Sequence, residues 1–239
     1  MNRINQTFNI KTEPYWLVAA SVFALLLINY FNLDFFFADL IYQPTNSWFY
    51  QKHIFTNLIV HKIGKYSIIL IYLAFVFKFI FRDKKHESQF KRHGQIVLLI
   101  SILLGTLMVS VLKHSLNVDC PWDLLQYGGD KPYFSLFNYN PVYLPSAHCF
   151  PSGHASSAFT WISLYFYSSI YHPQHRFKIL LAVLMVGFGF GLSQQFRGAH
   201  FISHDFWSLL VCLFVNIIVY SFAFNKYMAN KVYSVPIKV

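Results

Sequence analysis

The chain has 239 residues, of which 56% are hydrophobic and only 12% are charged, and its formal net charge is +10. Soluble domains carry roughly 25% charged residues, so this composition argues against a soluble globular protein. Uncharged runs such as 15–31 and 94–112 approach the roughly 20 apolar residues that a membrane-crossing helix needs, and they lack the alternation of a membrane β-barrel. The sequence therefore predicts an all-α, polytopic membrane protein with a single domain over residues 1–239.

Apolar runs predict six membrane-spanning helices, at about 15–33, 66–82, 95–113, 154–171, 178–194 and 204–224. The first run has no clear small-residue cleavage site and is interpreted as a retained anchor. Basic residues gather in the 83–93 and 172–177 loops and in the C-terminal tail, which predicts that these loops and both termini are cytoplasmic. The positive charge is therefore interpreted as a topology signal with some attraction to anionic membrane lipids, and not as nucleic-acid binding.

The segments 34–65, 114–153 and 195–203 are then expected on the opposite, outer side. Aromatic residues in 34–65 favour an interfacial helix that lies on the membrane. The 114–153 loop is too long for a simple connector, and its aromatic part, 133–144, is expected to shape the entrance for a lipid headgroup. Cys120 and Cys149 in this loop could form a disulfide if the outer side is oxidising, with two unlinked thiols as the alternative.

Three clusters of polar residues stand where apolar runs begin or end. They start at Lys113, cover 151–154, and cover 194–205. Ionisable groups at membrane spans are costly and usually have a function. Because all three clusters are expected at the outer face, we expect them to form one site.

Four residues of these clusters suit an anion-binding site. Ser152 can cap a helix, Gly153 lets the backbone approach a ligand closely, and helix N–H groups attract phosphate. Lys113 and Arg197 add positive charge, which phosphate oxygens require. Taken singly, each has an ordinary explanation, such as a lysine extending to the membrane surface. Their convergence favours phosphate chemistry.

Two histidines and a carboxylate complete the candidate site. His154 and His200 titrate near neutral pH, so that one can attack phosphorus and the other can protonate the departing oxygen. Asp205 could orient one imidazole. His200 and His204 are also spaced to bind a metal on one helical face, but the pattern is a weak signal and no HExxH glutamate accompanies it.

At these residues the sequence resembles the type 2 phosphatidic acid phosphatase superfamily. Members have six membrane helices and three signatures, Lys-x6-Arg-Pro, Pro-Ser-Gly-His and Ser-Arg-x5-His-x3-Asp. The second signature is complete at 151–154. In the first, Cys120 stands seven residues after Lys113 where the family has arginine. In the third, Gln194 replaces the arginine, and the residue four after His200 is His204, with Asp205 one position later.

The resemblance implies a membrane lipid phosphatase in which His200 becomes a phosphohistidine and His154 protonates the leaving group, without a metal or other cofactor. Arg197 is a candidate replacement for one missing arginine. Asp205 is favoured for orienting His200, and His204 remains the alternative. The expected partners are membrane lipids and a phosphorylated lipid substrate.

Prenyl diphosphates, lipid A and glycerophospholipids such as phosphatidylglycerol phosphate all fit as substrates. The expected location is a bacterial inner membrane, with the site on the periplasmic face. One alternative is a lipid phosphotransferase with the same site. Another is a non-catalytic protein that binds or transports phospholipids, because two arginines are missing. A zinc-dependent hydrolase ranks last.

Overall fold

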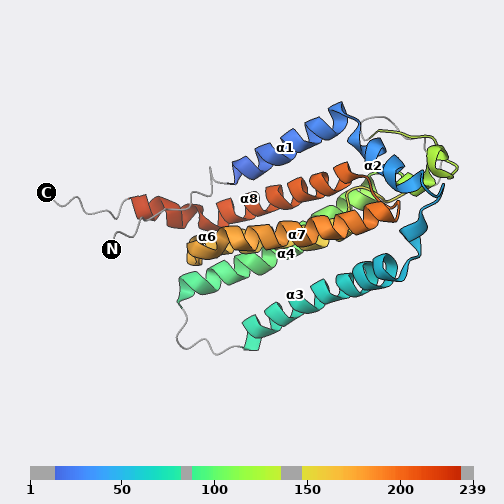
Figure 1. The fold of residues 1–239 in the computed structure, drawn as a ribbon. Coiled ribbons are helices and arrows are strands. Elements are labelled where there is room, and N and C mark those ends of the chain that lie inside the picture. Colours follow the sequence, from blue (N-terminus) through green and yellow to red (C-terminus); the bar gives the residue numbers. More distant parts are fainter. Residues whose placement is uncertain (1–13, 82–87, 136–146, 233–239) are drawn as a thin grey trace.

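A computed structural model describes residues 14–81, 88–135 and 147–232, and these residues are mainly helical. The long helices lie roughly side by side, and α2 lies at the opposite end of the bundle from the start of α1 and the end of α8 (Figure 1). Within the described ranges there is no strand, only two isolated bridges. The longer elements are α1 (Tyr15–Tyr30), α2 (Leu33–Tyr42), a π-helical segment (Ile54–Ile63) that continues into α3 (Gly64–Phe81), α4 (Gln89–Ser115), α5 (Gly153–Phe159), α6 (Ser163–Tyr171), α7 (Arg176–Phe196) and α8 (Ile202–Val232).

Four helices of the described chain are long and apolar enough to cross a membrane: Ile54–Phe81, Gln89–Ser115, Pro173–Phe196 and Ile202–Phe224. A fifth span results if α1 and α2, which bend by 67° at their junction, count as one. The bend follows from Asn32, whose φ of 51° is left-handed and interrupts the helix. The protein is therefore an all-α integral membrane protein, and the expected six spans are not confirmed.

The second expected span, 66–82, is wrong at its start. The helix begins at Ile54, where the His53 side chain accepts a hydrogen bond from the Phe55 amide at 3.3 Å. Residues 54–65, which the sequence placed in an outer segment, are therefore the first turns of a long helix. α2 occupies the earlier part of that segment, and an interfacial position for it is not confirmed.

The expected span at 154–171 forms the centre of the bundle. It consists of α5, a 3-10 turn at Thr160–Ile162, and α6. Its hydroxyl groups bond to carbonyls one turn back, as in Ser156 to Gly153 at 2.9 Å and Ser157 to His154 at 2.6 Å. Phe159, Ile162 and Tyr165 are fully buried. Because protein surrounds this segment, it needs fewer apolar residues than a helix that faces lipid.

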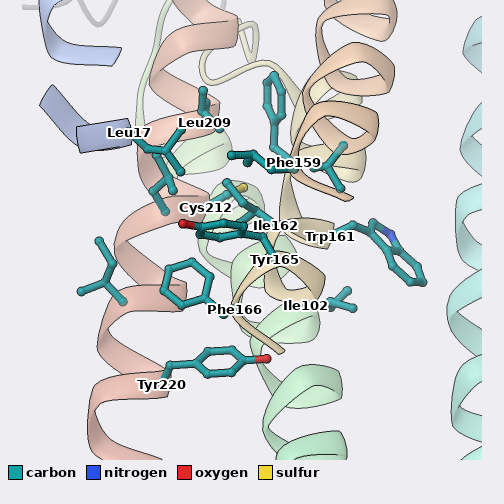
Figure 2. Close-up of a cluster of buried hydrophobic side chains, with 14 of the residues drawn as sticks. Leu17, Ile102, Phe159, Trp161, Ile162, Tyr165, Phe166, Leu209, Cys212 and Tyr220 are labelled. Carbon is teal, nitrogen blue, oxygen red and sulfur yellow. The ribbon is translucent and has the colours of Figure 1, made fainter. Parts of the chain in front are cut away.

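The main core surrounds this central segment. Aromatic and aliphatic side chains from α5 and α6 pack against side chains of α1, α4 and α8 (Figure 2). Tyr220 of α8 also donates a buried hydrogen bond to the Ser163 carbonyl at 3.0 Å. In contrast, α3 has no buried residue. The core thus fixes the start of α5 relative to α4 and α8, where the polar clusters of the sequence lie.

Candidate active site

The three polar clusters meet at one end of the bundle. Lys113 lies near the end of α4, Gly153 begins α5, and His200 lies between α7 and α8. The Lys113 ammonium lies 3.5 Å from the position that a Cβ on Gly153 would occupy. The charge of Lys113 also acts on His200 and His154. Segments that are far apart in the sequence therefore form one cationic, histidine-containing site.

The turn between α7 and α8 places His200. α7 ends at Phe196, and Gly198 has a φ of 73°, which a residue with a side chain rarely adopts. α8 starts at Ile202, and the Ser203 amide donates to the Asp34 carboxylate of α2 at 2.9 Å. Asp34 therefore supplies the cap that holds the start of α8 beside His200.

His200 is a buried, neutral imidazole. Its exposed fraction is 5%. Burial lowers the pKa of His200 well below its usual value of 6.5, and the charge of Lys113 lowers it further. Its Nδ1 is buried and has no hydrogen-bond partner in the described part of the chain. A neutral ring nitrogen carries the lone pair that a nucleophile needs.

His204 lies within the first turns of α8, next to His200. The two ring centroids are 5.7 Å apart. The Nδ1 of His204 is 2.9 Å from the Cys149 carbonyl oxygen. The structure joins Cys149 to Cys120 in a disulfide, with Cα atoms 5.2 Å apart. This crosslink fixes the residue whose carbonyl holds His204.

Asp205 is fully buried on the α7 side of the site. Its Oδ2 accepts a hydrogen bond from the Gln195 amide at 2.7 Å. The Ser152 side chain, also fully buried, lies near the same carboxylate. A Cβ on Gly191 would collide with the Asp205 carboxylate. The structure thus brings Asp205 to Ser152 and Gln195, and no hydrogen bond joins it to His200.

His154 contacts a residue that the sequence analysis did not select. Its Nε2 is 3.1 Å from the main-chain oxygen of His61, and the two imidazole rings stack with centroids 4.1 Å apart. Because a carbonyl only accepts, His154 Nε2 donates in this contact. His61 belongs to the helix Ile54–Phe81, which begins twelve residues before the expected span at 66–82.

The cations of the site are not paired with acids. The Arg197 guanidinium donates to the Gln194 side chain at 2.9 Å and to the Gln51 carbonyl at 3.2 Å. Neither Arg197 nor Lys113 forms a salt bridge with any described carboxylate. Half-buried or buried cations without a carboxylate partner favour binding of an anion.

The described residues contain one close group of three possible metal ligands, Cys120, Asp123 and Cys149. Because the two sulfur atoms form a disulfide, this group does not offer a thiolate metal site. Most of the aromatic loop 133–144 lies outside the described residues. Its first residue, Tyr133, packs against Phe35 and Phe201 beside the site.

Three residues of this region were not predicted from the sequence to belong to the site: His61, Asp34 and Gln195. His61 stood in a segment expected outside the helices. Asp34 follows the first apolar run, and only the folded chain brings it to α8. Gln195 follows Gln194, the position where the third signature of the family has an arginine, and the signature itself assigns no role to the next residue.

The fold and site define an integral membrane protein with a cationic, histidine-containing site at one end of a helical bundle. The model of the PAP2 superfamily matches residues 94–228, which is more than half of the chain. The chain therefore belongs to the PAP2 superfamily, and membership supports phosphatase activity in general.

The structure is also similar to a crystal structure described as the first transmembrane PAP2-type phosphatidylglycerolphosphate phosphatase from Bacillus subtilis. The TM-score is 0.53 at 15% identity, and the alignment covers 92% of this chain and 96% of that chain. At this identity the likeness concerns the fold. A comparison with curated protein sequences found no significant match.

Proposed function

We propose that the protein is a membrane lipid phosphatase that hydrolyses a phosphate or diphosphate ester through a phosphohistidine at His200. One observation carries the proposal: a buried, neutral imidazole lies beside the cation Lys113, which has no acidic partner among the described residues. A neutral nucleophile next to unpaired positive charge suits attack on an anionic phosphoryl group.

The proposed reaction has two steps. A ring nitrogen of His200 forms a bond to phosphorus while the bond from phosphorus to the lipid oxygen breaks, and His154 gives a proton to that oxygen. Water then attacks phosphorus, the bond to His200 breaks, inorganic phosphate leaves, and His154 takes up the proton. Lys113, Arg197, Ser152 and the side-chain-free Gly153 would bind the equatorial oxygens. No metal or other cofactor takes part in this scheme.

Asp205 and His204 remain the candidates for orienting His200. Asp205 supports Ser152 and is held by Gln195, whereas the His204 ring is adjacent to His200. We propose that Asp205 orients the phosphate-binding segment and His200 together. Retained activity in Asp205→Asn, combined with loss in His204→Phe, would assign the orienting role to His204.

We further propose that the site lies on the outer, periplasmic face of a bacterial inner membrane, with the termini in the cytoplasm. The disulfide supports an oxidising environment at the site's end of the bundle. The start of α1 and the end of α8 lie at the other end (Figure 1). Labelling an added cysteine beyond each end of the bundle in intact cells tests this orientation.

The enzymatic test is release of inorganic phosphate by the purified protein in detergent, with a chelator present. The substrates are a prenyl diphosphate, phosphatidate, phosphatidylglycerol phosphate and lipid A. We expect release from at least one of them, loss in His200→Ala, and no loss in His175→Ala, which changes an exposed histidine at the start of α7. Sensitivity to the chelator would revive the zinc hydrolase, and labelled phosphate on a lipid acceptor would indicate a phosphotransferase.

A further inference from the structure

His61 contacts His154 in two ways, although it belongs to none of the three signatures. Its main-chain oxygen lies 3.1 Å from the Nε2 atom of His154. Its imidazole stacks on the His154 imidazole, with ring centroids 4.1 Å apart and planes inclined by 21°. The first contact fixes one nitrogen of the His154 ring and the second fixes the plane of the ring. Together they hold the His154 ring in one orientation.

The backbone that carries His61 is itself held in place. Ile54–Ile63 is π-helical, and the chain becomes α-helical at Gly64. π-helical turns are rare and are frequent at functional sites. A Cβ on Gly64 would lie 3.1 Å from the Phe190 ring, so this part of the helix packs directly against α7. The His61 carbonyl is therefore an acceptor whose position is set by the helix.

The contact with this carbonyl decides which nitrogen of a neutral His154 carries the proton. Because Nε2 donates to the carbonyl, the neutral ring has its proton on Nε2 and a lone pair on Nδ1. Within the described chain no hydrogen bond occupies Nδ1, and the His154 side chain is partly exposed. Nδ1 is thus the ring nitrogen that is free to exchange a proton with a bound ligand.

A fixed Nε2–H suits proton transfer at Nδ1 in both steps of the proposed reaction. In the first step the Nδ1–H of a doubly protonated His154 gives its proton to the leaving oxygen, and the ring keeps its Nε2 proton. The carbonyl favours this doubly protonated ring, because a hydrogen bond to a charged form stabilises it. In the second step the Nδ1 lone pair takes a proton from the attacking water. The ring does not have to turn between the steps.

We propose that His61 is a positioning residue that holds His154 so that Nδ1 protonates the leaving oxygen and later deprotonates water. The proposal rests on the proposed function, because it takes His154 as the proton donor. The His61 main-chain oxygen fixes Nε2, and the His61 ring fixes the plane. Because the buried Nδ1 of His61 has no hydrogen-bond partner in the described chain, the His61 ring acts by packing, and a phenylalanine ring can replace it.

The kinetic test compares two phosphate monoesters that differ in their leaving group. Octyl phosphate releases an alkoxide, which needs a proton, whereas para-nitrophenyl phosphate releases a stabilised phenolate, which needs little protonation. In His61→Ala, kcat for octyl phosphate should fall about tenfold, which is part of what a general acid contributes, and kcat for para-nitrophenyl phosphate should change by less than about twofold. His154→Gln should show the same selectivity with a larger fall. His61→Phe should restore most of the activity toward octyl phosphate.

Lys62→Ala is the matched control, because it changes the exposed neighbour of His61 and should leave both rates unchanged. Thermal unfolding shows that each variant is folded. An equal fall for both esters in His61→Ala would mean that His61 has only a structural role. Unchanged rates for both esters in His61→Ala would mean that His154 does not depend on the His61 ring. Either result would overturn the proposal.

Nitrogen NMR of protein with isotope-labelled histidine separates this proposal from the proposed function. At mildly alkaline pH the signals of His154, identified by their loss in His154→Gln, should show the tautomer with its proton on Nε2, in the wild type and in His200→Ala. If phosphate esters are hydrolysed but His154 carries its proton on Nδ1, the positioning by His61 fails and the phosphatase function stands. If no ester is hydrolysed but the Nε2 tautomer is present, the phosphatase function fails and the His61 contact stands.

Discussion

Gly191→Ala tests the position of Asp205 without altering any group that takes part in the proposed chemistry. Gly191 and Gln195 are one helical turn apart on α7, and the Asp205 carboxylate rests against both. A Cβ at position 191 would collide with all three outer atoms of the carboxyl group. Because the neighbour is a fully buried group and not a flexible surface chain, Asp205 must move and its bond to Gln195 must weaken.

Overfilling a packed interior typically costs about 1–3 kcal/mol, and we expect a loss of this size in the free energy of unfolding. Phosphate release should fall by roughly tenfold or more, because a small misplacement in an active site has a large effect on rate. Gly189→Ala is the control, since a Cβ there meets nothing within 4 Å, and it should keep wild-type activity and stability. Thermal unfolding and phosphate release measure both effects. Wild-type values in Gly191→Ala would refute the view that Asp205 must stay where it lies.

Three further predictions use other contacts of the site. Replacing Cys120 and Cys149 by serine should lower the free energy of unfolding by about 2–4 kcal/mol, seen in thermal unfolding, and thiol labelling of the unreduced wild type should leave both residues unmodified. Asp34→Ala removes the acceptor for the Ser203 amide, so it should lower the free energy of unfolding by about 1 kcal/mol and reduce phosphate release. Asp34→Asn keeps an acceptor and should lose less stability and less activity. Because the lowered pKa of His200 keeps its imidazole neutral at pH 6.5, the rate of phosphate release should fall with acid only below that pH. A fall that begins above pH 6.5 would contradict this assignment.

The sequence predicted the helical membrane class because apolar runs of sufficient length have few other structures in a bilayer. It failed at the start of the second helix, where Asn57, His61, Lys62 and Lys65 dilute the apolar pattern of 54–65. Polar residues there indicate a loop if the segment faces lipid or water. In the folded protein His61 faces His154 instead, so the polarity belongs to the site.

The convergence of Lys113, Gly153 and His200 could be predicted, because each follows or precedes an apolar run on the same expected side. The groups that contact Asp205 could not be predicted from the sequence. Whether a residue just after His200 turns toward it depends on where α8 starts, and that start is set by Asp34, more than 160 residues earlier in the chain. Sequence spacing alone contains no information on such a contact.

The distribution of charge connects the site to the membrane topology. Loop lysines and arginines favour the cytoplasmic side, so cations at the end of the bundle that we propose to face outward work against the orientation that the rest of the chain favours. Lys65, Lys113 and Arg197 nevertheless meet at one end without carboxylate partners among the described residues, and Lys65 and Lys113 repel each other. An anionic ligand removes this repulsion, whereas salt screens charges effectively only beyond a Debye length of about 8–10 Å. Inorganic phosphate should therefore raise the thermal unfolding midpoint more than sodium chloride at equal ionic strength, and equal effects of the two salts would mean that the cations form no specific site.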